Sequence, residues 1–267
     1  MANTIYWGQA AVENTNGFGK APTNNTIDFG EVCADSWSPE TNLVGGSAVF
    51  SNTKSIELDG IDDRIECSSL TAYDNSDFSV SIWVKKTTSG LDYVVSNSSS
   101  STKAGFDIII NRLNVNFQRR TTTKQAATGY INIGFTYNTW HNLIGTYNDT
   151  TGDLKLYLDG VLKNTSTTSA DVNSASVDLR IGCSAVNSLP FQGGIDEVSI
   201  FNSELSQSDV TNIYNLGVPT SLSSYSSLIS WWRCGDGDAA PTLTDNGSGG
   251  NDGTMTNFTT FSTDVPT

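Results

Sequence analysis

Residues 153–164 read DLKLYLDGVLKN, and this stretch decides the fold class. Every second residue from Leu154 to Leu158 is leucine, which is the period-two pattern of a strand with one buried face. Asp159 and Gly160 follow, and this pair suits the two left-handed positions of a type I′ turn. The stretch therefore predicts a β-hairpin.

The same alternation recurs upstream in FSVSIWV, residues 78–84. Phe78, Val80, Ile82 and Val84 share one face, and smaller or polar residues take most of the other. Ser, Thr, Asn and Gly are abundant along the whole chain, which suits short strands joined by polar turns. We therefore expect an all-β protein, an antiparallel β-sandwich of two packed sheets with one short helix and an N-terminal repeat segment.

The single helix is expected over residues 206–217, before the C-terminal segment. Ser206 can cap its N-terminus, and Asp209, three residues later, can return the second bond of a capping box. Gly217 and Pro219 are suited to end it. Its apolar face is predicted to consist of Val210, Ile213 and Tyr214.

The composition excludes some classes of function. The 28 acidic residues outnumber the 14 basic ones, giving a formal net charge of -14, so a groove for nucleic acid is not expected. The sequence has no apolar run of membrane-spanning length and no basic and apolar leader, so we expect assembly in a reducing cytoplasm. The cysteines are then expected to be reduced and buried rather than metal ligands. They are Cys33, Cys67, Cys183 and Cys234.

The first part of the chain contains an eleven-residue repeat. Trp7, Phe18 and Phe29 each precede a glycine, and an Asn-Thr pair recurs at the same spacing. A unit this short cannot fold alone and needs a neighbouring surface to bury its ring. We predict an anchoring segment over residues 1–45, followed by one sandwich domain over residues 46–267; chance similarity in an Asn-rich segment is the alternative.

Four motifs, in order, resemble the laminin-G-like or concanavalin A-like jelly roll. They are SIELDGIDDRIEC at 55–67, FSVSIWVKK at 78–86, WHNLIGTYN with LKLYLDGVL at 140–162, and FQGGIDEVSIFNSELSQSDVTNIYN at 191–215. The resemblance implies a jelly-roll fold. It leaves the function open, because lectins, glycosidases, adhesion modules and viral structural proteins share this fold.

The C-terminal segment, residues 228–267, resembles the opening strand of that family, moved to the other end of the chain. SWWRCGDGD at 230–238 and DNGSGGNDGTMTN at 245–257 carry this resemblance. We predict that the segment closes the sandwich of its own chain; exchange with a neighbouring subunit and a truncated second module are the alternatives. Strand alternation would then send one tryptophan ring into the core.

No catalytic set is visible in the sequence. His141 is the only histidine, and the family resemblance gives it a structural place. Asp196 and Glu197 are adjacent, so a regular strand would point them to opposite faces, and a retaining glycosidase needs two carboxyls about 5 Å apart on one side. We therefore predict that the protein is not an enzyme.

Two kinds of binding site remain open. Asp59, Asp62 and Asp63 occupy one corner and could contribute oxygen ligands to calcium, although an ordinary polar turn is the preferred explanation for them. A sugar site would use exposed aromatic rings, for which Trp37, Tyr93 and Tyr137 are candidates. The sequence alone does not assign ligand-binding residues.

The layout also resembles structural proteins of marine bacteriophages. The main prediction is therefore a non-enzymatic virion structural protein: a capsid-decorating, fibre or tail-associated subunit located in the virion. Expected partners are other virion proteins at the N-terminal segment, further copies of the chain and cell-surface glycans, with no nucleic acid and no membrane. The alternative is a secreted bacterial carbohydrate-binding or adhesion module, with or without calcium.

Overall fold

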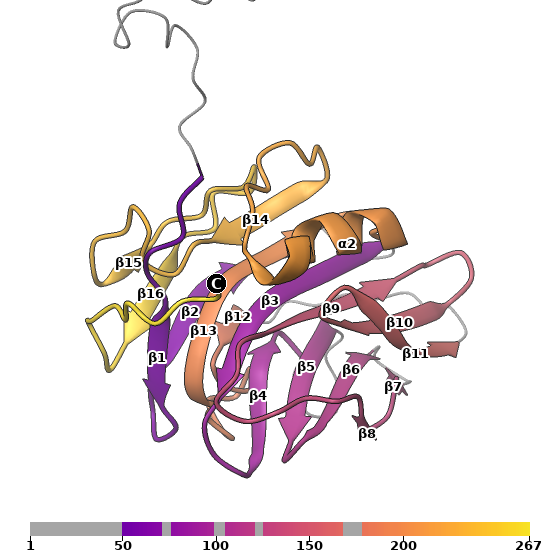
Figure 1. The fold of residues 1–267 in the computed structure, drawn as a ribbon, viewed down its shortest axis with the longest axis horizontal. Helices are drawn as coiled ribbons and strands as arrows, with labels where there is room; N and C mark the ends of the chain where they lie inside the picture. The colour runs from indigo at the N-terminus through magenta and orange to yellow at the C-terminus, as the bar shows by residue number, and fades with distance from the viewer. Residues whose placement is uncertain (1–49, 71–75, 99–104, 121–124, 168–177) are drawn as a thin grey trace, which may run out of the picture. The chain divides into compact units, whose positions relative to one another are not determined.

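A computed structural model describes residues 50–70, 76–98, 105–120, 125–167 and 178–267. They belong to one compact unit, Phe50–Thr267, built as two antiparallel sheets packed face to face (Figure 1). The predicted aromatic anchors Trp7, Phe18 and Phe29, and Trp37, lie outside the described residues. The predicted all-β sandwich with one short helix is confirmed.

The first sheet has seven strands within the described residues. In spatial order they are β1 (Ile56–Asp59), β13 (Gln192–Phe201), β3 (Phe78–Lys86), β9 (His141–Tyr147), β10 (Asp153–Leu158) and β11 (Val161–Thr167), with β14 (Leu228–Trp232) also paired to β13. The second sheet has nine. They are β15 (Thr242–Leu243), β16 (Gly253–Thr256), β2 (Arg64–Ser69), β12 (Asp178–Ile181), β4 (Leu91–Ser96), β5 (Gly105–Asn111), β6 (Asn114–Arg120) and β7 (Gln125–Ala127), with β8 (Ile131–Asn132) paired to β6.

The core lies between the two sheets and follows the predicted alternation. Phe78 of β3 is fully buried, and its ring centroid lies 5.4 Å from that of Phe106 and 6.1 Å from that of Phe117, both on the opposite sheet. Val80, Ile82 and Val84 belong to the same apolar cluster, with no exposed surface. Burial of large apolar side chains from both layers is the main favourable contribution to folding here.

The hairpin predicted from residues 153–164 forms between β10 and β11. Asp159 has φ 51° and Gly160 has φ 77°, so both turn residues are left-handed, as a type I′ turn requires. The turn is fixed to β9 as well, because the Asp159 carboxylate accepts a bond from the backbone N–H of Asn142 at 2.9 Å.

The predicted helix is α2 (Gln207–Tyr214), and it lies over the outer face of the seven-stranded sheet (Figure 1). Ser206 and Asp209 form both bonds of the capping box. Val210 and Ile213 are buried in a second apolar cluster with residues of that sheet. The helix ends at Asn215 in the left-handed conformation, before the predicted glycine.

The cap gives a first test of this local chemistry. We expect Ser206→Ala to lower the free energy of unfolding by about 1 kcal/mol, because a backbone N–H of the first turn loses its acceptor. Urea denaturation followed by tryptophan fluorescence measures the change. Ser224→Ala, an exposed serine outside the helix, is the matched control and should change stability by less than about 0.5 kcal/mol. Equal effects of the two substitutions would contradict the role of the cap.

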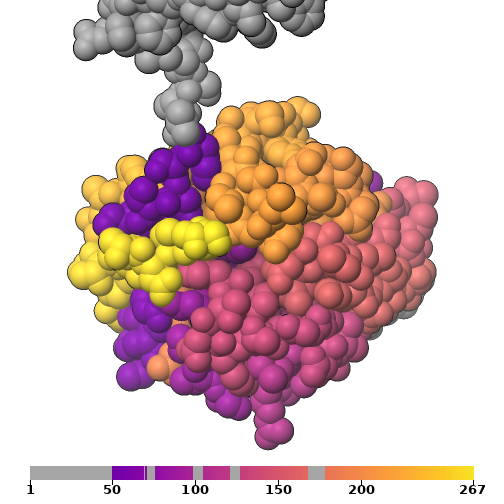
Figure 2. Space-filling model, viewed as in Figure 1, coloured from indigo at the N-terminus to yellow at the C-terminus, as the bar shows by residue number. Residues whose placement is uncertain are grey.

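The C-terminal segment lies in both sheets of its own chain. β14 pairs with β13, and β16 pairs with β2. The last residues also contact the beginning of the described chain, because Ser262 and Ser55 exchange backbone hydrogen bonds of 2.8 and 3.1 Å. Figure 2 shows these C-terminal residues packed on the surface beside the first described residues.

Candidate functional site

The outer face of the nine-stranded sheet carries polar side chains around β5, unlike the apolar outer face of the seven-stranded sheet. The seven-stranded sheet uses apolar side chains there and packs them under α2. On β5, Phe106, Ile108 and Ile110 point into the core, so Asp107 and Ile109 point outward. The outward residues of the neighbouring strands β4 and β6 around Asp107 are polar, and this is where the candidate site lies.

Asp107 is the centre of a polar network. Its carboxylate is fully buried and accepts bonds of 2.5 Å from each of three side chains: the hydroxyls of Ser96 and Ser98 and the amide of Gln118. The Nε atom of Arg120 lies 3.4 Å from the same carboxylate. Burial raises the pKa of Asp107, although these donors favour its ionised form. A network with this many satisfied bonds holds its members in fixed positions.

A pocket of about 210 Å³ opens beside this network. It is lined by Tyr93, Ser98, Arg120, Ser184, Val186, Ser188 and Leu189. Val186 and Leu189 are 57% and 41% exposed, and together they give the pocket an apolar rim. The loop that carries them is held to β4, because the backbone N–H of Tyr93 donates to the carbonyl of Leu189 at 3.1 Å.

The pocket combines two chemistries on one small surface. Tyr93, Val186 and Leu189 offer apolar and aromatic contact, while Arg120 and the serines offer hydrogen bonds. Binding pockets for small molecules have this character: an apolar lining with a few polar groups that fix orientation. A sugar ring matches it, because its C–H face is apolar and its edge carries hydroxyl groups.

Only part of this pocket is predictable from the sequence. Tyr93, one of the aromatic candidates, lines it, whereas Tyr137 lies in the connection before β9. Asp107 and Arg120 were missed. The signal for Asp107 was present in GFDIIIN, where one charged residue interrupts an apolar strand.

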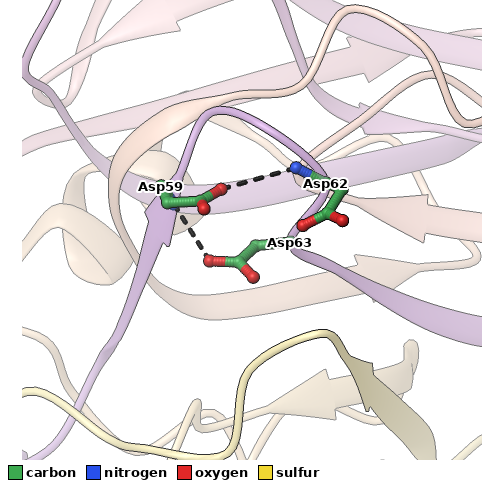
Figure 3. A group of neighbouring side chains, drawn as sticks. All are labelled: Asp59, Asp62 and Asp63. Carbon is green, nitrogen blue, oxygen red and sulfur yellow. Dashed lines mark hydrogen bonds between the residues drawn. The ribbon is translucent and has the colours of Figure 1, made fainter.

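The predicted calcium ligands do come together. One ligand atom from each of Asp59, Asp62 and Asp63 lies within 4.8 Å of the others (Figure 3). However, Asp59 accepts from the backbone N–H of Ile61 at 2.8 Å, and Asp63 accepts from that of Asp59 at 3.0 Å. These bonds stabilise the turn, and calcium needs about six to eight oxygens. The calcium site therefore stays a prediction.

The expectation for Asp196 and Glu197 is wrong. A bulge in β13 places Glu197 at φ 48°, and the register against β3 shifts between Asp196 and Ser199. Ile195 and Val198 on either side both point into the core, so both carboxyls lie on the outer face of the sheet. The Asp196 carboxylate accepts from the backbone N–H of Glu197 at 2.8 Å.

Glu197 of this buried pair is held by the tryptophan-rich C-terminal stretch, and Asp196 accepts from the side-chain amide of Asn52 at 2.9 Å. The indole N–H of Trp231 donates to Glu197 at 2.5 Å, and Arg233 lies 3.4 Å from the same carboxylate. The Arg233 guanidinium also lies 4.5 Å from the ring centroid of Phe50. Asp236 accepts from the backbone N–H of Thr53 at 2.8 Å. The stretch therefore fixes the point where the described chain enters the sandwich, which is a structural role.

The buried pair predicts a pH dependence of stability. Burial raises the pKa of Glu197 to about 7, and burial together with the adjacent carboxyl raises that of Asp196. The folded state then holds protons that the unfolded state has released between about pH 5 and pH 7. We therefore expect the free energy of unfolding to fall as the pH rises through this window, measured by urea denaturation.

The matched variants isolate this effect. Asp196→Asn should reduce the slope of stability against pH, whereas Asp62→Asn, at an exposed turn, should leave it unchanged. A slope of the opposite sign, or an Asp196→Asn variant with the full slope, would contradict the assignment.

His141 connects two elements. Its Nδ1 atom lies 2.7 Å from the carboxylate of Asp159 in the hairpin turn. Its Nε2 atom accepts from the backbone N–H of Thr136 at 3.2 Å, so the neutral ring carries its proton on Nδ1 and donates it to Asp159. Both ring nitrogens are engaged in fixing the fold, which agrees with the structural place expected from the sequence.

The fold and the site define an antiparallel jelly-roll sandwich with a pocket on one outer face. The family profile of the concanavalin A-like lectin/glucanases superfamily matches residues 59–211. The chain therefore belongs to this superfamily. The comparison with curated proteins gives no match. Within the described residues, no helix has the length and apolar character needed to cross a membrane.

Several solved structures share the fold. A presumed carbohydrate-binding protein from Bacteroides ovatus has a TM-score of 0.62 at 16% identity, over 81% of this chain and 62% of its own. The receptor binding domain of botulinum neurotoxin mosaic serotype C/D has a TM-score of 0.51 at 20% identity, over 62% of this chain and 43% of its own. This chain thus spans less than two thirds of either structure, and the likeness is one of fold.

Proposed function

We propose that the chain is a non-catalytic glycan-binding module, with its ligand seated in the pocket of Tyr93 and Arg120. The observation that supports this most directly is the buried Asp107 network beside an exposed apolar rim. Such a network fixes Ser98 and Arg120 before any ligand arrives, and preorganised polar groups lose less entropy on binding.

The charges favour a neutral glycan. The carboxylate of Asp107 compensates the positive charge of Arg120, with Nε 3.4 Å away. The chain as a whole carries a formal net charge of -14, which repels anionic ligands at long range. A neutral sugar avoids both the loss of this ion pair and the repulsion.

Two further observations support binding without catalysis. The carboxyls of Asp196 and Glu197 are buried in the seven-stranded sheet, where Glu197 is bonded by Trp231, and His141 uses both ring nitrogens for structure. The carbohydrate-binding and receptor-binding names of the similar folds agree with the proposal, although at these identities they support only the fold.

A glycan array with the labelled full chain tests the proposal. We expect retention on a subset of neutral glycans and none on sulfated or uronic-acid glycans. Hydrolysis products should be absent after prolonged incubation with the retained glycan. Failure to retain any glycan would overturn the proposed function, and release of shortened sugars would overturn its non-catalytic character.

A virion location is a separate proposal, which rests on the sequence alone. Its motivating feature, the repeat of Trp7, Phe18 and Phe29, lies outside the described residues. We expect the native protein to band with nuclease-protected DNA in a density gradient. A variant in which Trp7, Phe18 and Phe29 are all replaced by alanine should be lost from particles. Protein found only in the soluble or secreted fraction would contradict the virion location and favour a secreted adhesion module.

A further inference from the structure

A row of outward-pointing polar side chains crosses six neighbouring strands of the nine-stranded sheet. Its members on β4, β5 and β6 are buried, and those on β16, β2 and β12 are accessible. Each member is the registered partner of the next, from β16 through β2, β12, β4 and β5 to β6. In this order the row is Thr254, Glu66, Arg180, Ser96, Asp107 and Gln118. The flanking residues of these strands, such as Ile65 and Ile181, point into the core.

A second depression lies at the far end of this row. It is open, has a volume of about 510 Å³, and is lined by Glu66, Cys67, Ser68, Asp178, Arg180 and Thr254. Its charged groups are paired: Arg180 lies 3.9 Å from Glu66 and 3.8 Å from Asp178. The depression is thus polar, and its two carboxylates share one guanidinium.

Arg180 joins the two depressions. It lines the second one, and its Nε atom donates to the side-chain carbonyl of Asn187 at 3.0 Å. Asn187 lies between Val186 and Ser188, which line the first pocket. The two depressions are therefore neighbours along the row, with one side chain and one loop between them.

The dimensions indicate an elongated ligand. Neighbouring strands lie about 4.8 Å apart, so the accessible part of the row, from Thr254 to Arg180, spans roughly 10 Å, and the pocket of Tyr93 extends this length. The first pocket, at about 210 Å³, is smaller than the roughly 300–1,000 Å³ of pockets that hold drug-sized molecules. It has room for a single ring, and the rest of a longer chain would meet the second depression.

We propose that the ligand is a linear neutral oligosaccharide that lies across the strands, with one ring at Tyr93 and further units reaching Glu66 and Thr254. This inference rests on the proposed glycan-binding function and names the ligand class. The carboxylate of Glu66 and the hydroxyl of Thr254 would hydrogen-bond the distal sugar hydroxyls.

The test is a length series. Cello-, xylo- and manno-oligosaccharides of one to six units are titrated into the full chain by calorimetry. For the series that binds, we expect the affinity to rise by at least about tenfold between the monosaccharide and the longest oligomers, the effect of a few added hydrogen bonds.

Variants of the second depression distinguish ligand contacts made there from those made in the first pocket. Glu66→Gln and Thr254→Ala should each lower the affinity for the longest oligomers and leave that for the shortest unchanged. Thr165→Ala, an exposed threonine on β11 of the other sheet, is the matched control and should change neither. Far-UV circular dichroism confirms that each variant is folded.

The outcomes separate the two proposals. Binding that does not strengthen with ligand length would overturn the proposal that the ligand extends to the second depression. Unchanged affinity of the Glu66 and Thr254 variants for long oligomers would do the same. In both cases the proposed sugar binding at the pocket of Tyr93 would be unaffected. Failure of all three series and of the glycan array would overturn the proposed function and, with it, the proposal of an elongated ligand.

Discussion

Replacement of Trp232 by alanine is expected to lower the free energy of unfolding by about 3–5 kcal/mol, the usual cost of removing a large buried ring. Trp232 is fully buried in the main core, and its indole N–H donates to the carbonyl of Asn251 at 2.9 Å. The buried ring therefore attaches the C-terminal segment to the core, and its hydrogen bond holds the part of the segment before β16 in place. Urea denaturation followed by circular dichroism measures the change.

The control for this prediction is another large apolar residue at the surface. Leu216 is 91% exposed, so Leu216→Ala should change stability by less than about 0.5 kcal/mol. If Trp232→Ala were as mild as Leu216→Ala, the C-terminal segment would not be part of the core.

Replacement of Tyr93 by alanine is expected to weaken glycan binding by about 10- to 100-fold. Aromatic residues at the centre of a binding site are the usual hot spots, worth about 2 kcal/mol or more on truncation. The Tyr93 ring lines the pocket, and burial raises the pKa of its hydroxyl, which Arg120 contacts. Calorimetric titration with the glycan retained on the array gives the affinity.

Tyr137→Ala is the matched control for the binding test. Tyr137 is partly buried like Tyr93, but it lies in the connection before β9 and does not line the pocket. Its replacement should leave the affinity unchanged. Equal losses in the two variants, or no loss in either, would place the ligand elsewhere.

Local chemistry explains why several elements could be predicted from the sequence. The turn at Asp159 and Gly160 depends only on two left-handed residues between alternating strands. The capping box of Ser206 and Asp209 depends on residues three positions apart. In each case the deciding contacts lie within a few residues, so the pattern in the sequence is sufficient.

The bulge at Glu197 could not be predicted in the same way. Alternation places adjacent residues on opposite faces, and only the register against β3 shows that one residue is inserted. The contacts with Trp231 and Arg233 that accompany it come from more than thirty residues away. The sequence contains no local signal for them.

The candidate site was hidden for the same reason. Asp107, Ser96 and Gln118 meet because β4, β5 and β6 pair in one particular register. A shift of one residue would turn Asp107 into the core. The row from Thr254 to Gln118 likewise depends on five registers, and it becomes visible only once the sheet is assembled.

The most direct test of this account is a crystal structure of the full chain with the longest oligosaccharide that binds. We expect one sugar ring against Tyr93 within hydrogen-bonding distance of Arg120, and further units crossing Arg180 toward Thr254. Sugar bound at the corner of Asp59 and Asp63, or on the seven-stranded sheet, with the pocket empty would contradict it.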